Sequence, residues 1–534
     1  MASLNKSLFT SSTTPPLLHP KPCPSISQLT LSLNKRRFYT IRSSLDHDDQ
    51  HNIINGHDLP RRNMIINIGL GGLSSVTARV GAMAAPIQAP DLTKCGPPDL
   101  PSGAEPTNCC PPYKPEIADF RLPPPSSPMR VRPAAHLVDK EYIAKYSKAV
   151  ALMKALPPND PRNFTQQANI HCAYCDGAFD QVGFPNIEIQ VHNSWLFFPW
   201  HRFYLYFNER ILGKLIGDPT FALPYWNWDA PSGMRIPSMY TNPSSPLYDK
   251  LRDAKHQPPT LVDLDYNGTD PKISDKQQIQ SNLTIMYRQM VSNGKTAQLF
   301  LGSPYRAGEN PTGCGSLENV PHGPVHMLGG MRRDFTDPDW LNASFLFYDE
   351  NAQLVRVKVR DCLDPSAMRY KYQEVDFPWL KTKPTPKSPK GTKPSQQLKK
   401  KSITDGFPIS LNKVVQVTVK RPKQGRTQKE KQEEEEVLVI EGIELNGDTA
   451  VKFDVYVNDD DESVRPDKSE FAGSLVNVPH KHEKKVKTNL RLGITDLLED
   501  LGVEDDDEVV VTIVPRIGNK EVVSIGGVRI VFAS

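Results

Sequence analysis

Histidines set among aromatic residues are the feature that most constrains how this chain can fold. Three of them occupy short segments that are rich in Trp, Tyr and Phe: His171 in HCAYC, His192 in VHNSW and His201 in PWHR. Two more, His322 and His326, stand four residues apart, a spacing that places both rings on one face if the segment is helical. Neutral imidazole nitrogens in apolar surroundings suit copper, zinc or iron. The pattern therefore predicts a buried metal site.

Other interpretations of these residues are weaker. A single histidine is more often a hydrogen-bonded core residue than a ligand, but five in two clusters favour a metal. The spacing of Cys172 and Cys175 resembles half of a structural zinc site, yet no second Cys/His pair follows at short spacing. A thioredoxin-like redox pair is also disfavoured, because no βαβ pattern surrounds these two cysteines.

Length, charge and composition narrow the class of protein. The chain has 534 residues, which predicts two to four folded units, and 38% of its residues are hydrophobic, enough to bury a core. Lys and Arg number 64 against 61 Asp and Glu, and the net charge of +3 gives no support to binding of nucleic acid or to a polybasic membrane protein. The 50 prolines predict long non-helical connections.

The first 84 residues have the composition of a two-part targeting region. The first acidic residue is Asp46, and the 45 residues before it hold six Lys or Arg and 14 Ser or Thr, as organelle transit peptides do. Arg61-Arg62 then precede an apolar stretch over 64–73 and an Ala-Met-Ala cleavage site that ends at Ala84. That stretch is well short of the roughly 20 residues that span a bilayer. We expect import into a plastid, then twin-arginine transport into the thylakoid lumen, and no integral membrane segment.

Hydrophobic periodicity divides the remainder into a helical and a β region. Apolar residues recur at helical spacing near 139–156, 198–216 and 277–291, and strand-like runs follow at 354–359 and from residue 407 onward. A Lys- and Pro-rich stretch over 378–402 separates the two as a solvated, protease-accessible linker. The predicted fold class is α+β multidomain: a mainly α-helical bundle that holds the metal, followed by a C-terminal antiparallel β-sandwich.

These motifs resemble those of the plant polyphenol oxidases (catechol oxidases), type-3 dicopper enzymes of the tyrosinase family. The histidine segments match the two copper sites, the sequence that begins at Asp339 resembles the family's DWL region, and Lys452-Phe-Asp-Val resembles its KFDV region. The resemblance implies the following parts: a chloroplast and thylakoid transit peptide over 1–84, a Pro- and Cys-rich arm over 85–135, a copper domain over 136–336 that is truncated after residue 327, a DWL region over 337–377, a Lys/Pro-rich linker over 378–406 and a KFDV-type β domain over 407–534.

The resemblance also implies a role for each site residue. His171, His192 and His201 would bind the first copper, and His322 and His326 the second. A thioether bond would join Cys175 to His192, and Glu318 would act as the acidic residue that holds a water near the copper pair. The implied disulfides, which would tie the arm to the copper site and which the lumen permits, are Cys95–Cys110 and Cys109–Cys172.

The implied reaction is the oxidation of o-diphenols to o-quinones with reduction of O2 to water. Small phenols, O2 and the thylakoid import machinery are then the expected partners. Gly323, which follows His322, loosely favours diphenol oxidation over monophenol hydroxylation. Dioxygen transport on a similar site, as in hemocyanin-like proteins, is disfavoured by the plastid signals.

The sequence departs from the family pattern at the second copper site. Each copper of a type-3 pair needs three histidines, and only two can be found here for the second. His326 and Met327 run directly into the segment that should follow a further helix, which carries the third ligand. Loss of that helix would expose core surface of its neighbours, at ~25 cal/mol per Å2 of apolar area. We therefore expect this form to be inactive, loaded with a single copper or poorly folded.

Overall fold

The computed structural model describes residues 85–100, 106–267, 272–322, 337–392, 406–459, 465–479, 485–517 and 523–533. All of these belong to a single unit that spans residues 75–534. The predicted targeting region lies outside the described residues, and so do His326, Gly323 and the junction that follows Met327. No described helix is long and apolar enough to cross a membrane.

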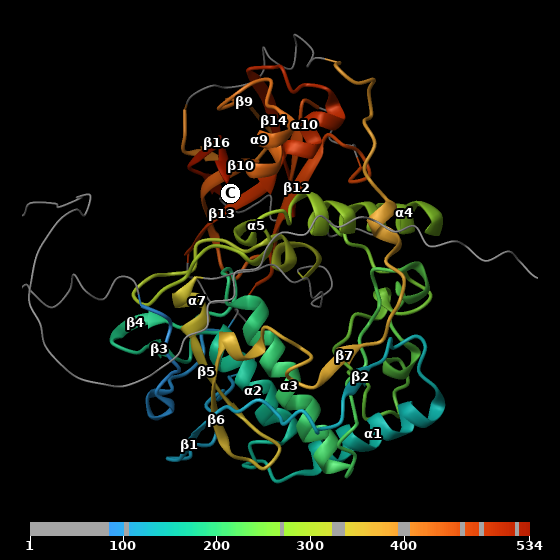
Figure 1. Cartoon of the computed structure of the whole chain (residues 1–534), viewed down its shortest axis with the longest axis vertical. Helices are drawn as coiled ribbons and strands as arrows, with labels where there is room; N and C mark the ends of the chain where they lie inside the picture. The colour runs from blue at the N-terminus through green and yellow to red at the C-terminus, as the bar shows by residue number, and fades with distance from the viewer. Residues whose placement is uncertain are drawn as a thin grey trace, which may run out of the picture. The chain divides into compact units, whose positions relative to one another are not determined.

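Helices α1 (Lys140–Ala155), α2 (Phe164–Cys175) and α3 (Phe197–Leu215) lie together in the first half of the chain (Figure 1). Side-chain caps fix where the first two begin: the Asp139 carboxylate accepts the Tyr142 N–H, and the Asn163 side chain accepts the Thr165 N–H. Further along the chain come α4 (Asp275–Tyr287), α5 (Ala297–Leu301) and α7 (Pro338–Asn342), with single turns at Arg288–Ser292 and Glu318–His322.

A small sheet closes one side of the helical core. Its strand order is β1 (Ile117–Asp119), β6 (Leu354–Lys358) and β5 (Ser344–Tyr348), so the N-terminal arm pairs with a hairpin far along the chain. Phe347 of β5 stacks on Phe207 of α3 and on Tyr174 of α2, with ring centroids 5.4 and 6.4 Å apart. These rings join the helices and the sheet in one apolar core.

The arm is also fixed to α3 by a buried ion-pair cluster. Strand β2 (Arg130–Arg132) pairs in parallel with β7 (Tyr370–Tyr372). Arg130 and Arg132 each donate through Nε to one carboxylate oxygen of Glu209, both at 2.7 Å. Glu209 is fully buried in α3, two turns beyond His201. The arm therefore bonds directly to a helix that carries a predicted ligand.

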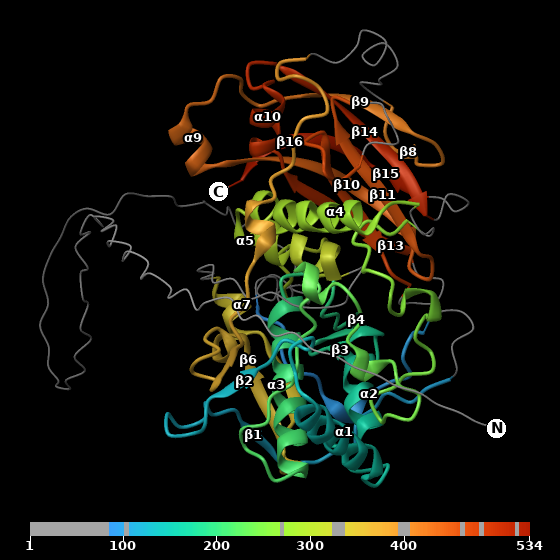
Figure 2. The same cartoon turned by 90° about the vertical axis from the view of Figure 1, so that its right-hand side faces the viewer.

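From residue 409 the regular structure of the described residues is mainly β, with two short helices (Figure 2, orange and red). One antiparallel sheet has the order β13-β10-β15-β8, with β16 also on β10, and the other has the order β12-β11-β14-β9. One apolar cluster, which includes Leu438, Ile440, Phe453 and Val511, draws residues from both sheets. The strands are β8 (Ile409–Ser410), β9 (Val415–Lys420), β10 (Glu435–Asn446), β11 (Val451–Val457), β12 (Phe471–Asn477), β13 (Lys485–Gly493), β14 (Glu508–Ile517), β15 (Ser524–Ile525) and β16 (Gly527–Ala533), with the short helices α9 (Gln428–Glu433) and α10 (Thr495–Leu501). The predicted fold class is confirmed.

The described part of the segment between the two regions, residues 378–392, contacts both of them. The indole of Trp379 is buried and donates to Asp229 at 2.9 Å, on the helical side. Further on, the Lys387 N–H donates to the Glu470 carboxylate at 2.9 Å, beside β12. Most side chains from residue 380 to 392 are exposed.

Candidate metal centre

Three of the predicted ligands come from three consecutive parts of the helical core. His171 lies one turn before the last residue of α2, and His201 lies in the second turn of α3. His192 lies between them, on the loop that joins strand β4 (Phe184–Glu188) to α3. The sequence links all three elements within about thirty residues, so a local fold brings these rings together.

The three rings converge closely enough to share one ion. Each offers a nitrogen, and these nitrogens all lie within 4.8 Å of one another. The ring centroids are 5.4 Å apart for His171 and His192, 5.4 Å for His171 and His201 and 5.2 Å for His192 and His201. Among the residues that the structure describes, this is the one group of three or more potential metal ligands.

Backbone carbonyls orient two of the predicted ligand rings. Nδ1 of His201 lies 2.7 Å from the Phe197 carbonyl oxygen, and Nδ1 of His322 lies 3.1 Å from the Glu318 carbonyl oxygen. A carbonyl can only accept, so Nδ1 of each ring carries the proton and Nε2 presents its lone pair. This second hydrogen bond is the usual way in which proteins fix the tautomer of a metal-binding histidine.

His322 lies beside the three-histidine group. Its ring centroid is 5.6 Å from that of His192 and 6.3 Å from that of His201. Phe197 fills the space between, with centroids 4.6 Å from His201 and 4.5 Å from His322. Four of the five predicted ligands therefore share one wall of aromatic rings, and the fifth, His326, lies outside the described residues.

The loop that carries His192 is fixed by its own backbone. Asn193 has φ +58°, the left-handed conformation that asparagine tolerates better than most residues. Its N–H donates to Glu318 Oε1 at 2.6 Å, and its carbonyl accepts the Gly313 N–H at 3.1 Å. The loop is thus bonded to the segment that leads to His322.

Glu318 is an unusual carboxyl group. It is 6% exposed, and its pKa is raised to about 8 by burial, although backbone N–H groups of Asn193 and Ser194 act against the shift. Oε2 has no hydrogen-bond partner within the described part of the chain. Glu318 lies one turn before His322 and bonds to the loop of His192, so it links the segments that carry these two histidines.

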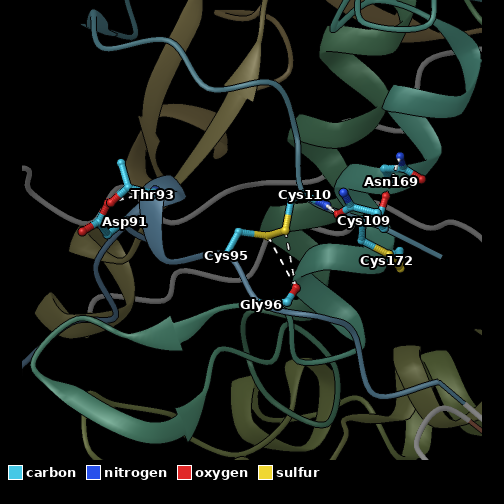
Figure 3. The surroundings of a disulfide bond; sticks show 9 residues. Asp91, Thr93, Cys95, Gly96, Cys109, Cys110, Asn169 and Cys172 are labelled. Carbon is cyan, nitrogen blue, oxygen red and sulfur yellow. Dashed lines mark hydrogen bonds between the residues drawn. A yellow bond between two sulfur atoms is a disulfide. The ribbon is translucent and has the colours of Figure 1, made fainter. Parts of the chain in front are cut away.

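A disulfide joins the N-terminal arm to α2, the helix that carries His171, and a second disulfide lies beside it within the arm (Figure 3). Cys109 pairs with Cys172, the residue after His171 in α2, and Cys95 pairs with the neighbouring Cys110. The Cys95 and Cys110 sulfurs both face the Gly96 carbonyl. These are the pairings that the resemblance implies. Cys175 is buried at the end of the same helix.

Sequence reasoning did not identify two residues that shape the centre. Phe197 separates His201 from His322, and its position four residues before His201, on the same helix face, is a signal that could have identified it. Gln190 lies two residues before His192 and bonds to it. No sequence pattern marks Gln190, because the other contact of its side chain, with the Cys175 carbonyl oxygen, is to helix α2.

The three imidazole nitrogens fit a first-row transition metal that prefers nitrogen ligands. Three imidazoles in an aromatic wall suit copper in both of its common oxidation states, as well as zinc. Fold and centre together define a protein with a candidate histidine metal site in a helical core, followed by a β domain.

Comparisons with known proteins identify the family. The common central domain of tyrosinase matches residues 161–348, the polyphenol oxidase middle domain residues 334–385, and the chloroplastic polyphenol oxidase C-terminal domain residues 407–532. A chloroplastic polyphenol oxidase of Malus domestica is 56% identical over 89% of this chain and 90% of its own length. Aureusidin synthase of Antirrhinum majus is 51% identical over 85% of this chain and 90% of its own length.

Solved structures agree with these relatives. Latent apple tyrosinase has a TM-score of 0.74 and 56% identity, and the match covers 78% of this chain and all of that one. Latent aurone synthase, a polyphenol oxidase, has a TM-score of 0.77 and 40% identity over 84% of this chain and 99% of its own. This chain belongs to the plant polyphenol oxidase family, within the tyrosinase superfamily, and it is an oxidoreductase. Members of the family bind copper, and the curated relatives named chloroplastic support a chloroplast location.

Proposed function

We propose that this chain oxidises o-diphenols to o-quinones and reduces O2 to water at a pair of copper ions. The observation that carries the proposal is the convergence of His171, His192 and His201, whose ligand nitrogens lie within 4.8 Å of one another. Membership of a family of phenol oxidases supplies the reaction class, and the choice of o-diphenol as substrate rests on the sequence resemblance.

His171, His192 and His201 would hold the first copper, and His322 with His326 the second. Copper exchanges single electrons, so a bound pair would supply the two-electron redox chemistry that a diphenol requires. Phe197 packs against both His201 and His322 and would form part of the aromatic wall of the site. The thioether between Cys175 and His192 remains part of the proposal.

Glu318 is proposed to hold a water, or a substrate proton, at Oε2. Oε1 is already used by the Asn193 N–H, so the second oxygen is the one directed to another group. Its position one turn before His322 supports this role. Glu318→Gln keeps the shape and the acceptor at Oε1, and we expect it to lower kcat more than copper content.

The location within the chloroplast is proposed to be the thylakoid lumen, reached through the plastid import and twin-arginine machinery. The Arg61-Arg62 signal and the cleavage site at Ala84 support it. Two disulfides in the arm agree with an oxidising compartment. The proposed domain limits remain those that the sequence suggests.

One specific observation favours a second candidate: a chain that binds copper at the first site only and does not turn over. The alignment with the Malus domestica relative runs over 538 positions, but only 89% of the residues of this chain take part in it. These residues are fewer than the aligned positions, so the alignment contains positions at which this chain has no residue. A gap near residue 327 would remove the third ligand of the second site.

A single preparation distinguishes the two candidates. The chain from Ala85 onward is expressed, loaded with copper, assayed with catechol under O2 and analysed for metal content. Two coppers per chain with turnover support the first candidate, and one copper without turnover supports the second. His201→Ala should lose the first copper, whereas His256→Ala, which removes a ring paired with Asp253 at 2.9 Å, should not. A chain that binds no copper in any preparation contradicts both.

A further inference from the structure

Gln190 connects two elements that carry proposed ligands. It lies between β4 and His192 and is 6% exposed. Its side-chain Nε2 donates to the Cys175 carbonyl oxygen at 2.7 Å, and its Oε1 accepts the His192 N–H at 2.9 Å. One amide group thus bonds the end of α2 to the loop that carries His192.

These two hydrogen bonds affect the separation of the His171 and His192 rings. His171 lies one turn before Cys175 on the same helix, so whatever fixes the Cys175 carbonyl also fixes the backbone from which His171 projects. The other end of the amide bonds to the backbone of His192 itself. The two rings have centroids 5.4 Å apart, close enough to bind one ion.

We propose that Gln190 is a positioning residue for the first copper site: its amide sets the distance between His171 and His192. This inference rests on the proposed function, since it assumes that these histidines bind copper. Gln190 does not itself touch the metal or the substrate. A metal site needs its ligands held close to the required geometry before the ion arrives, and residues that orient ligands commonly change metal affinity by about 10- to 100-fold when they are replaced.

Chemistry restricts what can replace this side chain. The position requires a donor toward Cys175 and an acceptor toward His192 at the same time, which glutamine provides and an ionised glutamate does not. Ionised glutamate keeps the acceptor but directs a second oxygen at the Cys175 carbonyl oxygen. Methionine keeps the length and removes both bonds, leaving a buried N–H and a buried carbonyl to find other partners.

The chain offers a matched control in Asn282. It is fully buried in α4, and its amide is used in the same way: Nδ2 donates to the Val262 carbonyl at 2.7 Å, and Oδ1 accepts the Leu264 N–H at 3.1 Å. Neither of these two partners belongs to an element that carries a proposed ligand. Replacement of Asn282 therefore measures the loss of a buried amide bridge away from the proposed ligands.

The experiment compares Gln190→Glu and Gln190→Met with Asn282→Asp and Asn282→Leu, the corresponding changes of the shorter side chain, in the full chain from Ala85. Cu(I) alone is the probe, and its affinity is measured by competition with a chromogenic Cu(I) chelator, with thermal unfolding of the copper-free proteins recorded beside it. The Gln190 variants should lose at least about tenfold in affinity, while the Asn282 variants retain wild-type affinity and both pairs lose similar thermal stability.

Equal affinity losses in the two pairs, or wild-type affinity in Gln190→Met, would overturn the inference. A wild-type chain that binds no Cu(I) would instead contradict the proposed function. Failure of the proposed function and failure of this inference therefore give different results. If Gln190→Glu does not fold, Gln190→Met decides the question, because it introduces no charge.

Discussion

Replacing Glu209 by glutamine should destabilise the helical core more than almost any other change of a single charge. Glu209 is fully buried in α3, and its carboxylate accepts from Arg130 and Arg132, both at 2.7 Å, and from the Leu223 N–H at 2.9 Å. Arg130 is 5% and Arg132 3% exposed, so neither guanidinium can recover its hydration when the negative charge is removed.

The magnitude follows from the burial of this cluster. Breaking a buried ion pair by removing one partner costs about 3–5 kcal/mol, because the remaining charge is left uncompensated. The glutamine in Glu209→Gln also directs an NH2 group at one of the two guanidinium groups, which are donors only. With an m value of about 3 kcal/mol per M in urea, the unfolding midpoint should fall by about 1–2 M.

The assay is urea unfolding of the copper-free chain, followed by near-ultraviolet circular dichroism, which reports the packing of the aromatic core. Asp275→Asn is the control, because its pair with Arg235 is exposed on both sides, with side chains 70% and 43% accessible, and exposed pairs contribute up to about 1 kcal/mol. A midpoint shift for Glu209→Gln no larger than that of Asp275→Asn would refute the reasoning.

Three further predictions concern other contacts. Replacing both Cys109 and Cys172 by serine opens a loop with a sequence separation of 63 and should lower the free energy of unfolding by about 4 kcal/mol, measured by urea unfolding; a loss below about 1 kcal/mol would contradict it. Trp340→Phe removes the indole N–H that donates to a buried backbone carbonyl of the His192 loop at 2.8 Å, and should cost about 1–3 kcal/mol in the same assay, whereas an unchanged midpoint would show that the bond is dispensable. Lys452→Met removes the ammonium group 2.7 Å from Asp265. In the wild-type chain burial raises the pKa of Asp265 to about 6 although Lys452 lowers it, so the substitution should raise this pKa further. Limited proteolysis of the variant should then release the β region more readily at pH 9 than at pH 5, because the unpaired buried carboxylate is charged at the higher pH. A pKa raised above the unfolded value of 3.8 makes the contribution of Asp265 to stability complete below pH 3.8 and lost as the pH rises through the folded-state pKa; equal proteolysis at both pH values would contradict this prediction.

Strong periodicity in the sequence located most of the regular elements. The stretches predicted near 139–156, 198–216 and 277–291 are α1, α3 and α4, and the β-branched runs after residue 407 are strands of the two sheets. Helix α2 was not predicted, because buried Gln167 and Asn169 interrupt its apolar face. Strand β12 was also missed, since its glycine, alanine and serine lack the β-branched signal.

The sequence by itself determined which residue types the centre contains, because imidazole-rich segments among aromatic residues have few other uses. It also indicated the helical region, the β region and their order, since these depend on local periodicity. Only the tertiary structure decided how the ligand segments are held. The amide of Gln190 between α2 and the His192 loop, the carboxylate of Glu318 on Asn193 and the phenyl ring of Phe197 between His201 and His322 are contacts between elements. Such contacts depend on distances in space, which no spacing along the chain encodes.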